Sequence, residues 1–231
     1  MDGTRARRQG RPQKRNAPDA REALVAAARE LLRTRLPAEI NRLDLARLAG
    51  VDPALVRYYF GNKDGLLLET AHRMVQEMRA ERSSAQQGQE SFRGKLAAYA
   101  HHLIDVLHRY PFLHDLLLEQ IARAGAGEAR ELRREFIDEP WREVRGLLDQ
   151  GVQSGEIRAV EVSFFYVALI GMCSFPMRHQ FLLAQIRNTP DVSARMAAEY
   201  AAFVADTLIE GLALRAHDRR AVAEAGCAQV A

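Results

Sequence analysis

The side chains best suited to recognition chemistry lie together in residues 41–63, NRLDLARLAGVDPALVRYYFGNK. The guanidinium group of Arg57 can donate two hydrogen bonds at once, to O6 and N7 of a guanine. Its neighbour Tyr58 can stack on a sugar, touch a thymine methyl group or donate to a phosphate. We therefore expect Arg57 to read a base and Tyr58 to assist. An ion pair of Arg57 with Asp52 or Asp64 is the competing interpretation.

Further residues of the same segment complete the candidate DNA contacts. Two apolar side chains suit thymine methyl groups, and four polar ones suit phosphates, which position a protein on DNA without reading its sequence. Lys63 opens an expected helix, whose N–H groups also favour an anion. Phe60 is expected in the core, and a core position is also the alternative for Tyr59. The apolar contacts are Ala54 and Leu55, and the phosphate contacts are Asn41, Arg42, Tyr59 and Lys63.

These side chains need a rigid element to present them, and residues 41–60 have the spacing of a helix-turn-helix. Ala46 stands where two helices approach closely, and Gly50 stands where the turn needs a positive φ, which glycine takes without strain. Asp52 is placed to cap the second helix and Pro53 to open it. Val56 is the apolar plug between the helices. The segment thus predicts the unit that sets one helix into a DNA major groove.

The segment resembles the TetR family of transcriptional regulators over about a quarter of the chain. The matching positions are Leu45-Ala46, Ala49-Gly50-Val51, Tyr59-Phe60, Lys63 and Leu66. The chain departs from the family at Leu36-Pro37, where a glycine and an aromatic residue are usual, and at Arg57, where a tyrosine is usual. The resemblance implies an all-α protein with a three-helix DNA-binding domain, followed by a helical domain for effector binding and dimerisation.

Hydrophobic periodicity predicts nine helices and no strands. Their expected bounds are 20–35, 42–49, 53–60, 63–83, 90–109, 111–123, 128–154, 160–186 and 189–215, with a kink at Pro140. The expected domains are a basic flexible arm (1–17), a DNA-binding domain with a connecting helix (18–78), an effector and dimerisation domain (79–216) and a flexible tail (217–231).

Positive charge concentrates at the start of the chain. The 231 residues carry a net charge of +3, yet residues 1–18 hold six basic side chains against one acidic one. An arm of this kind neutralises phosphates or enters a minor groove. A solvated tail that aids solubility is the alternative.

The second domain offers candidate lining for a small-molecule site, as the resemblance implies. Aromatic and methionine side chains favour a largely apolar effector, although the same residues would also fill a core. Trp141 stands out because its N–H needs a partner. The candidates are His101, Phe112, His114, Trp141, Phe165, Met172 and Phe175.

Residues 160–186 and 189–215 have broad apolar faces. The resemblance implies that these two helices form a four-helix bundle with a second copy, although the same stripes could serve the core of one chain. A twofold dimer would place two recognition helices about 34–36 Å apart, one turn of DNA. We therefore expect a homodimer on a pseudo-palindromic operator in double-stranded DNA.

Other classes of protein receive little support from the sequence. It has no P-loop, GxGxxG, HExxH, GxSxG or CxxC motif, so we expect no enzyme and no cofactor. His101, Asp105 and His108 share one helix face, but without a fourth ligand no metal site is expected. The two cysteines give no disulfide framework, which suits a reducing compartment. The sequence also shows no signal peptide and no apolar run long enough for a membrane span, so we expect a cytoplasmic protein.

The sequence therefore predicts a sequence-specific regulator of transcription. We expect a repressor that a small, largely apolar effector releases from DNA. The alternative is a protein of the same kind that organises DNA or binds a protein partner without a small-molecule effector. A second domain without a cavity would favour that alternative.

Overall fold

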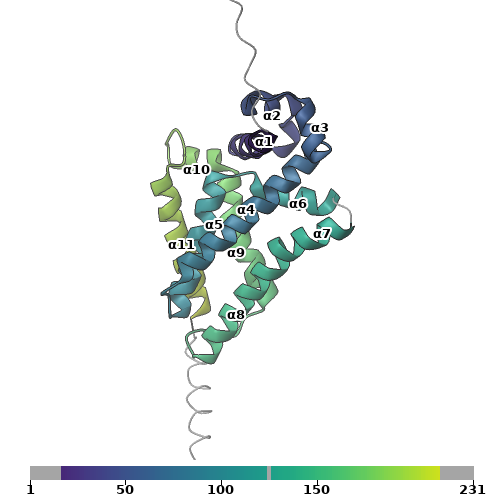
Figure 1. Cartoon of the computed structure of the whole chain (residues 1–231). Coiled ribbons are helices and arrows are strands. Elements are labelled where there is room, and N and C mark those ends of the chain that lie inside the picture. Colours follow the sequence, from purple (N-terminus) through teal and green to yellow (C-terminus); the bar gives the residue numbers. More distant parts are fainter. Residues whose placement is uncertain (1–16, 124–125, 214–231) are drawn as a thin grey trace, which may run out of the picture.

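The computed structural model describes residues 17–123 and 126–213, and this part of the chain is all-α, as predicted (Figure 1). The expected arm lies outside the described residues except for Ala17, and so does the expected tail. The elements are α1 (Ala17–Leu31), η1 (Pro37–Glu39), α2 (Arg42–Ala49), α3 (Ala54–Phe60), α4 (Lys63–Gln86), α5 (Phe92–Arg109), α6 (Leu113–Arg123), α7 (Ala126–Arg133), η2 (Arg134–Asp138), α8 (Glu139–Gln153), α9 (Val162–Arg178), α10 (Gln180–Ile186) and α11 (Ala194–Leu212).

Helices α1 to α3 pack on the first half of α4 around a small core. Its leucines, among them Leu24, Leu32, Leu45 and Leu66, are fully buried. Burying each one contributes about 1.5–3 kcal/mol relative to leaving it exposed. At the turn between α2 and α3, Gly50 has a φ of 67°, which confirms the positive φ expected there. The helix-turn-helix is therefore held by one compact core beneath α4.

Helix α4 connects the two halves of the molecule. Figure 1 shows it running from beneath α1–α3 to the far end of the second domain. Its buried side chains follow the helical period, beginning with Leu66 and Leu67 and ending with Met74 and Val75. The helix continues to Gln86, so the first half of the interval 84–89 left between two expected helices belongs to its last turn.

The second domain is built around α5. Helices α4, α8, α9 and α11 all contact α5, and the buried face of α5 forms a second core with those of α8, α9 and α11. The apolar stripe of α11, from Ala197 to Leu212, lies in this core. That stripe was expected at a dimer interface, but in the structure it is buried against the same chain.

Two of the nine expected helices are divided. Residues 128–154 form α7, the π-helix η2 and α8, because Pro140 lacks an N–H and is accommodated in the first turn of α8. Residues 160–186 form α9 and α10, which meet at a bend of 77°. Pro176 of α9 cannot donate to the carbonyl of Met172, and the Tyr200 hydroxyl donates to that oxygen instead, at 2.8 Å.

In the described part of the chain, no single helix has the length and apolarity needed to cross a membrane. Only the bent pair of α9 and α10 meets these two requirements, and only when its two helices are taken together.

The start of α4 depends on a close approach that only glycine permits. A Cβ on Gly65 would lie 2.2 Å from the carbonyl oxygen of Phe60, whereas a Cβ on Gly146 of α8 would meet nothing within 4 Å. We expect Gly65→Ala to lower the free energy of unfolding by about 1–3 kcal/mol through overpacking. Gly146→Ala should leave it unchanged or raise it by up to about 1 kcal/mol. Urea unfolding of both variants checks this, and equal stabilities would contradict it.

Candidate DNA-binding helix and effector cavity

Helix α3 is anchored by one face and exposed on the other. Val56 is fully buried, and Leu55, Tyr59 and Phe60 are half-buried against the core of α1–α4. This leaves Ala54, Arg57 and Tyr58 exposed, with Tyr58 77% accessible. The helical period thus turns three of the expected DNA contacts outward together.

The side chain of Arg57 has no ion pair or hydrogen bond within the described residues. The expected competitor Asp52 instead caps α3, because its Oδ1 accepts the backbone N–H of Ala54 at 2.7 Å. No ion pair joins Arg57 to Asp64 in this part of the chain either. The guanidinium group on the exposed face of α3 is therefore available to an outside partner.

The four expected phosphate contacts have different surroundings. Asn41 caps α2, where its Oδ1 accepts the N–H of Asp44 at 2.9 Å. Lys63 donates from Nζ to the carbonyl of Pro37 at 3.3 Å, which ties α4 to η1. Arg42 is exposed, and Tyr59 packs edge-on against its neighbour Tyr58 at 4.9 Å between ring centroids. Asn41 and Lys63 thus have structural contacts in the protein itself.

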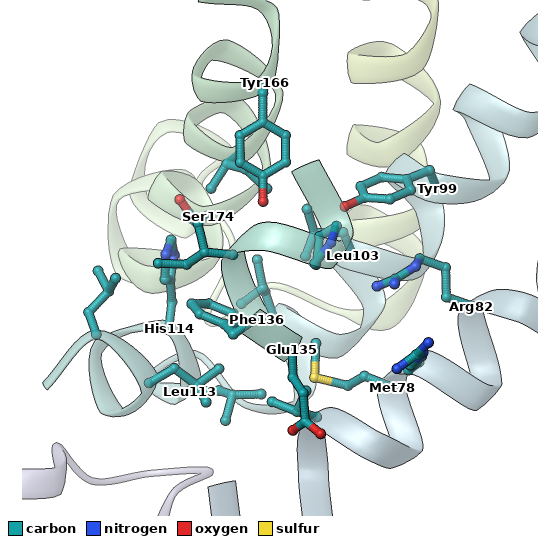
Figure 2. Close-up of a pocket in the computed structure, with 18 of the residues that line it drawn as sticks. Met78, Arg82, Tyr99, Leu103, Leu113, His114, Glu135, Phe136, Tyr166 and Ser174 are labelled. Atoms are coloured by element: carbon teal, nitrogen blue, oxygen red, sulfur yellow. The ribbon is translucent and has the colours of Figure 1, made fainter. Parts of the chain in front are cut away.

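The second domain contains a partly open cavity of about 400 Å³ (Figure 2). Its walls come from α4, α5, α6, η2, α8 and α9. Helices α4, α5, α6 and α9 contribute side chains three or four residues apart, and most of them are apolar. Examples are Val75 and Met78 of α4, Leu103 and Leu107 of α5, and Phe136 of η2. A hollow of this size and composition is typical of a small-molecule site, for which volumes of about 300–1,000 Å³ are common.

Of the seven expected effector contacts, one lines this cavity, namely His114. Phe165 belongs to the core, and Phe175 is 57% exposed. His101 is exposed on α5 beside a separate hollow, and Met172 is half-buried against the core. The other two are engaged by arginines, Phe112 under Arg178 and Trp141 under Arg145.

Helical phase explains this correction to the expected set. Positions 165 and 172 of α9 face the core, and the cavity side of α9 carries Tyr166, Ile170 and Ser174 at intervals of four residues. Tyr99, Leu103 and Leu107 form the matching line on α5. The interval of four is visible in the sequence, but only the packing of α9 shows which of its faces meets the cavity.

The arginines at the cavity are neutralised by carboxylates of α8. The Nη2 of Arg82 lies 2.8 Å from Oε2 of Glu143, and the Nη1 of Arg79 lies 2.6 Å from Oε2 of Glu139. Glu143 also accepts a hydrogen bond from Gln86 at 2.9 Å. These pairs link α4 to α8 across the cavity rim and leave neither arginine with an uncompensated charge.

The acidic and imidazole groups of the lining are also accounted for. Glu135, which is 8% exposed, accepts hydrogen bonds from Gln76 at 2.6 Å, and His72 lies 3.4 Å away. Burial lowers the pKa of His114, so this ring is neutral at physiological pH. The lining of the cavity is therefore largely apolar, and the charge of Glu135 is paired with Arg134, whose Nη2 lies 3.9 Å from Oε1 of Glu135.

The histidine-rich face of α5 does not assemble a metal site. Nε2 of His108 lies 2.7 Å from the carbonyl of Val192, and Asp105 forms an ion pair with Arg109 at 2.9 Å. No group of three His, Cys, Asp or Glu side chains with metal-binding geometry occurs in residues 17–123 and 126–213.

A family model described as "Tetracyclin repressor-like, C-terminal domain" matches residues 89–217, more than half of the chain. The chain belongs to the TetR family. The curated relatives that match this chain are regulators of transcription. Regulators of this family bind DNA and small effector ligands.

Curated relatives include the transcriptional regulator BetI of Agrobacterium fabrum, 37% identical over 84 residues, which are 36% of this chain and 41% of that protein. BetI of Rhizobium meliloti is 32% identical over 81 residues, 35% of this chain and 40% of that protein. The matched segment therefore spans about two fifths of the length of these relatives.

Solved structures share the fold at low sequence identity. A transcriptional regulator from Saccharomonospora viridis in complex with choline has a TM-score of 0.68 at 15% identity, covering 86% of this chain and all of the other. KstR2 of Mycobacterium tuberculosis, a ketosteroid transcriptional regulator, has a TM-score of 0.67 at 13% identity. The match covers 84% of this chain and 95% of KstR2. FadR of Bacillus subtilis in complex with stearoyl-CoA has a TM-score of 0.60 at 19% identity. The match covers 83% of this chain and 98% of FadR.

Proposed function

We propose that this TetR-family protein is a sequence-specific repressor, released from a pseudo-palindromic operator by a small, largely apolar effector. The observation that carries the proposal is the double role of α4. Leu66 and Leu67 of this helix pack in the core that holds α3, and two turns later Val75 and Met78 line the cavity. A ligand that shifts α4 therefore shifts the recognition helix.

Residues 18–78 are the proposed DNA-binding domain, and residues 79–216 are the proposed effector and dimerisation domain. In the first, Arg57 and Tyr58 contact bases from the exposed face of α3, supported by Ala54 and Leu55. Phosphates are held from the flanks of α3. The flanking contacts are Asn41, Arg42, Tyr59 and Lys63.

Coupling between the two sites needs a ligand that favours one position of α4 over another. The hydrogen bond from Gln76 to the buried Glu135 joins the middle of α4 to the π-helix η2, whose Phe136 forms part of the cavity wall. Arg79 and Arg82 join the next turns of α4 to α8. A ligand that pushes on η2 or α8 therefore acts on α4 through three polar links.

Ligands named for the fold neighbours support an effector role for the cavity. The Bacillus subtilis FadR structure holds stearoyl-CoA, and the Saccharomonospora viridis structure holds choline. These ligands differ widely in charge and size. The effector of this chain is therefore inferred from its own largely apolar lining.

Dimerisation is proposed through the outer faces of α9 and α11. Phe164 and Val167 of α9 are 78% and 69% exposed, and Phe203 of α11 is 59% exposed. The hydrogen bond from Tyr200 to the carbonyl of Met172 holds these two helices side by side. A large exposed apolar patch usually marks an interface, and a twofold pair would present two copies of α3 to successive turns of DNA.

The DNA-binding part of the proposal is tested by fluorescence anisotropy on the intergenic DNA beside the gene, with scrambled DNA as reference. We expect the native fragment to bind about 10³-fold more tightly than scrambled DNA. Arg57→Ala should weaken the free energy of binding to the native fragment by about 1–3 kcal/mol and relax specificity at one base pair. Arg142→Ala, an exposed arginine of α8, is the matched control. An equal loss on both DNAs would make Arg57 a phosphate contact.

The dimer is tested by sedimentation of the wild type and of a Phe164→Arg, Phe203→Arg double variant. We expect the wild type to sediment as a dimer and the variant as a monomer, because two buried, unpaired guanidinium groups oppose association. The variant should also lose affinity for the native fragment. Leu43→Arg places the same charge on an exposed leucine of α2 and should remain dimeric. A dimeric double variant would contradict this interface.

The effector part is tested by filling the cavity. Leu103→Trp adds volume at a half-buried wall position of α5. We expect the variant to bind the native fragment normally but to lose binding of the fluorescent apolar probe Nile red. Compounds screened for release of the native fragment from the wild type should fail to release it from the variant. Release that is equally effective from both proteins would place the effector elsewhere.

A further inference from the structure

Two tyrosines supply unpartnered polar groups to the cavity. Tyr99 of α5 is 2% exposed, and Tyr166 of α9 is half-buried. Neither hydroxyl makes a hydrogen bond within the described residues. Figure 2 shows both hydroxyls pointing into the cavity. Each hydroxyl therefore offers a hydrogen bond to an oxygen or nitrogen atom of a molecule bound in the cavity.

Each tyrosine lies at one end of a row of apolar side chains on the cavity face of its helix. Tyr99 is followed at intervals of four by Leu103 and Leu107, and Tyr166 is followed by Ile170. A ligand with an apolar body along these side chains would therefore bring its polar end to the hydroxyls.

Both hydroxyls act as neutral donors. Burial raises the pKa of Tyr166 to about 12, and burial also raises the pKa of Tyr99 well above its usual value. The two phenols therefore keep their protons throughout the physiological range. A neutral phenol can donate one hydrogen bond to a carbonyl oxygen, which has two lone pairs to accept them.

The charges near this end of the cavity do not favour an anion. Arg82 lies beside both tyrosines, with its guanidinium 5.4 Å from the Tyr99 ring. Its Nε and Nη2 are committed to Glu143, at 3.2 and 2.8 Å. A carboxylate bound here would face Glu143 while finding no unpaired cation, and burying a charge without a partner is strongly unfavourable.

We propose that the cavity takes a neutral, largely apolar molecule with a carbonyl oxygen, a ketone or an ester, and that the hydroxyls of Tyr99 and Tyr166 donate hydrogen bonds to that oxygen. The proposal rests on the effector role of the cavity and names the chemical class of the effector. The two tyrosines bind the carbonyl group of the ligand, and the apolar side chains of α5 and α9 contact its apolar body.

The test compares three probes of similar chain length, each displacing Nile red from the full-length protein at pH 7.5. They are 2-undecanone (neutral), undecanoate (anionic) and decyltrimethylammonium (cationic). We expect the ketone to displace Nile red at a concentration about tenfold lower than either charged probe. Equal or stronger displacement by undecanoate or by the ammonium probe would overturn the proposal, and so would failure of all three probes to displace the dye.

Hydroxyl deletions identify the groups responsible. Tyr99→Phe and Tyr166→Phe should each lower the affinity for 2-undecanone by about three- to tenfold, because each variant loses one hydrogen bond to the ligand. The affinities for the two charged probes should not change. Tyr110→Phe, which removes a hydroxyl outside this cavity, should change nothing. Circular dichroism melting verifies that the variants fold. A ketone affinity unchanged in both cavity variants would overturn the assignment of the tyrosines.

A parallel readout separates this proposal from the proposed repressor function. The same probes are added to the protein bound to labelled native DNA. Ketone-selective, tyrosine-dependent binding without release of DNA would support the ligand class and contradict release by an effector. Release of DNA by undecanoate alone would support an effector-controlled repressor and overturn the carbonyl assignment.

Discussion

Helix α4 packs against both halves of the molecule, and this double packing links the recognition helix to the cavity. One helix must present Leu66 and Leu67 to the core of α1–α3 and, two turns later, Val75 and Met78 to the second domain. Closely packed interiors transmit displacement because they leave little free space to absorb it. A helix of 24 residues that packs in the core beneath α3 and also lines the cavity cannot move at one place without disturbing the other.

The cavity persists beside α4 because polar links, and not only apolar contacts, bridge its walls. Arg82 and Glu143 join α4 to α8, and Gln76 and Glu135 join α4 to η2. These bonds span the rim and neutralise the charges there, so the interior between them remains apolar and open. A cavity with satisfied polar edges favours a ligand that is neutral over most of its length.

The DNA-binding half was accessible to sequence reasoning because its signals are local. Gly50 shows the expected positive φ, and Val56 is buried as expected from its spacing. Both features follow from residue type and spacing within the 20 residues of the helix-turn-helix, which the sequence shows directly. The division of residues 160–186 was missed because Pro176 was not expected to precede a bend. The hydroxyl that satisfies the freed carbonyl comes from Tyr200, 28 residues away from Met172.

Residue types and their spacing were sufficient to predict the family, the all-α class and the apolar periods of the long helices, because these are properties of single elements. The packing of the helices then showed which faces of α9 and α11 meet the chain's own core and which remain exposed. The packing also showed that most of the expected effector contacts lie outside the cavity. The cavity is lined instead by the rows of side chains that begin at Tyr99 on α5 and at Tyr166 on α9. The physical reason is rotation about the helix axis, because a period of 3.6 residues defines a face but not the direction in which that face points.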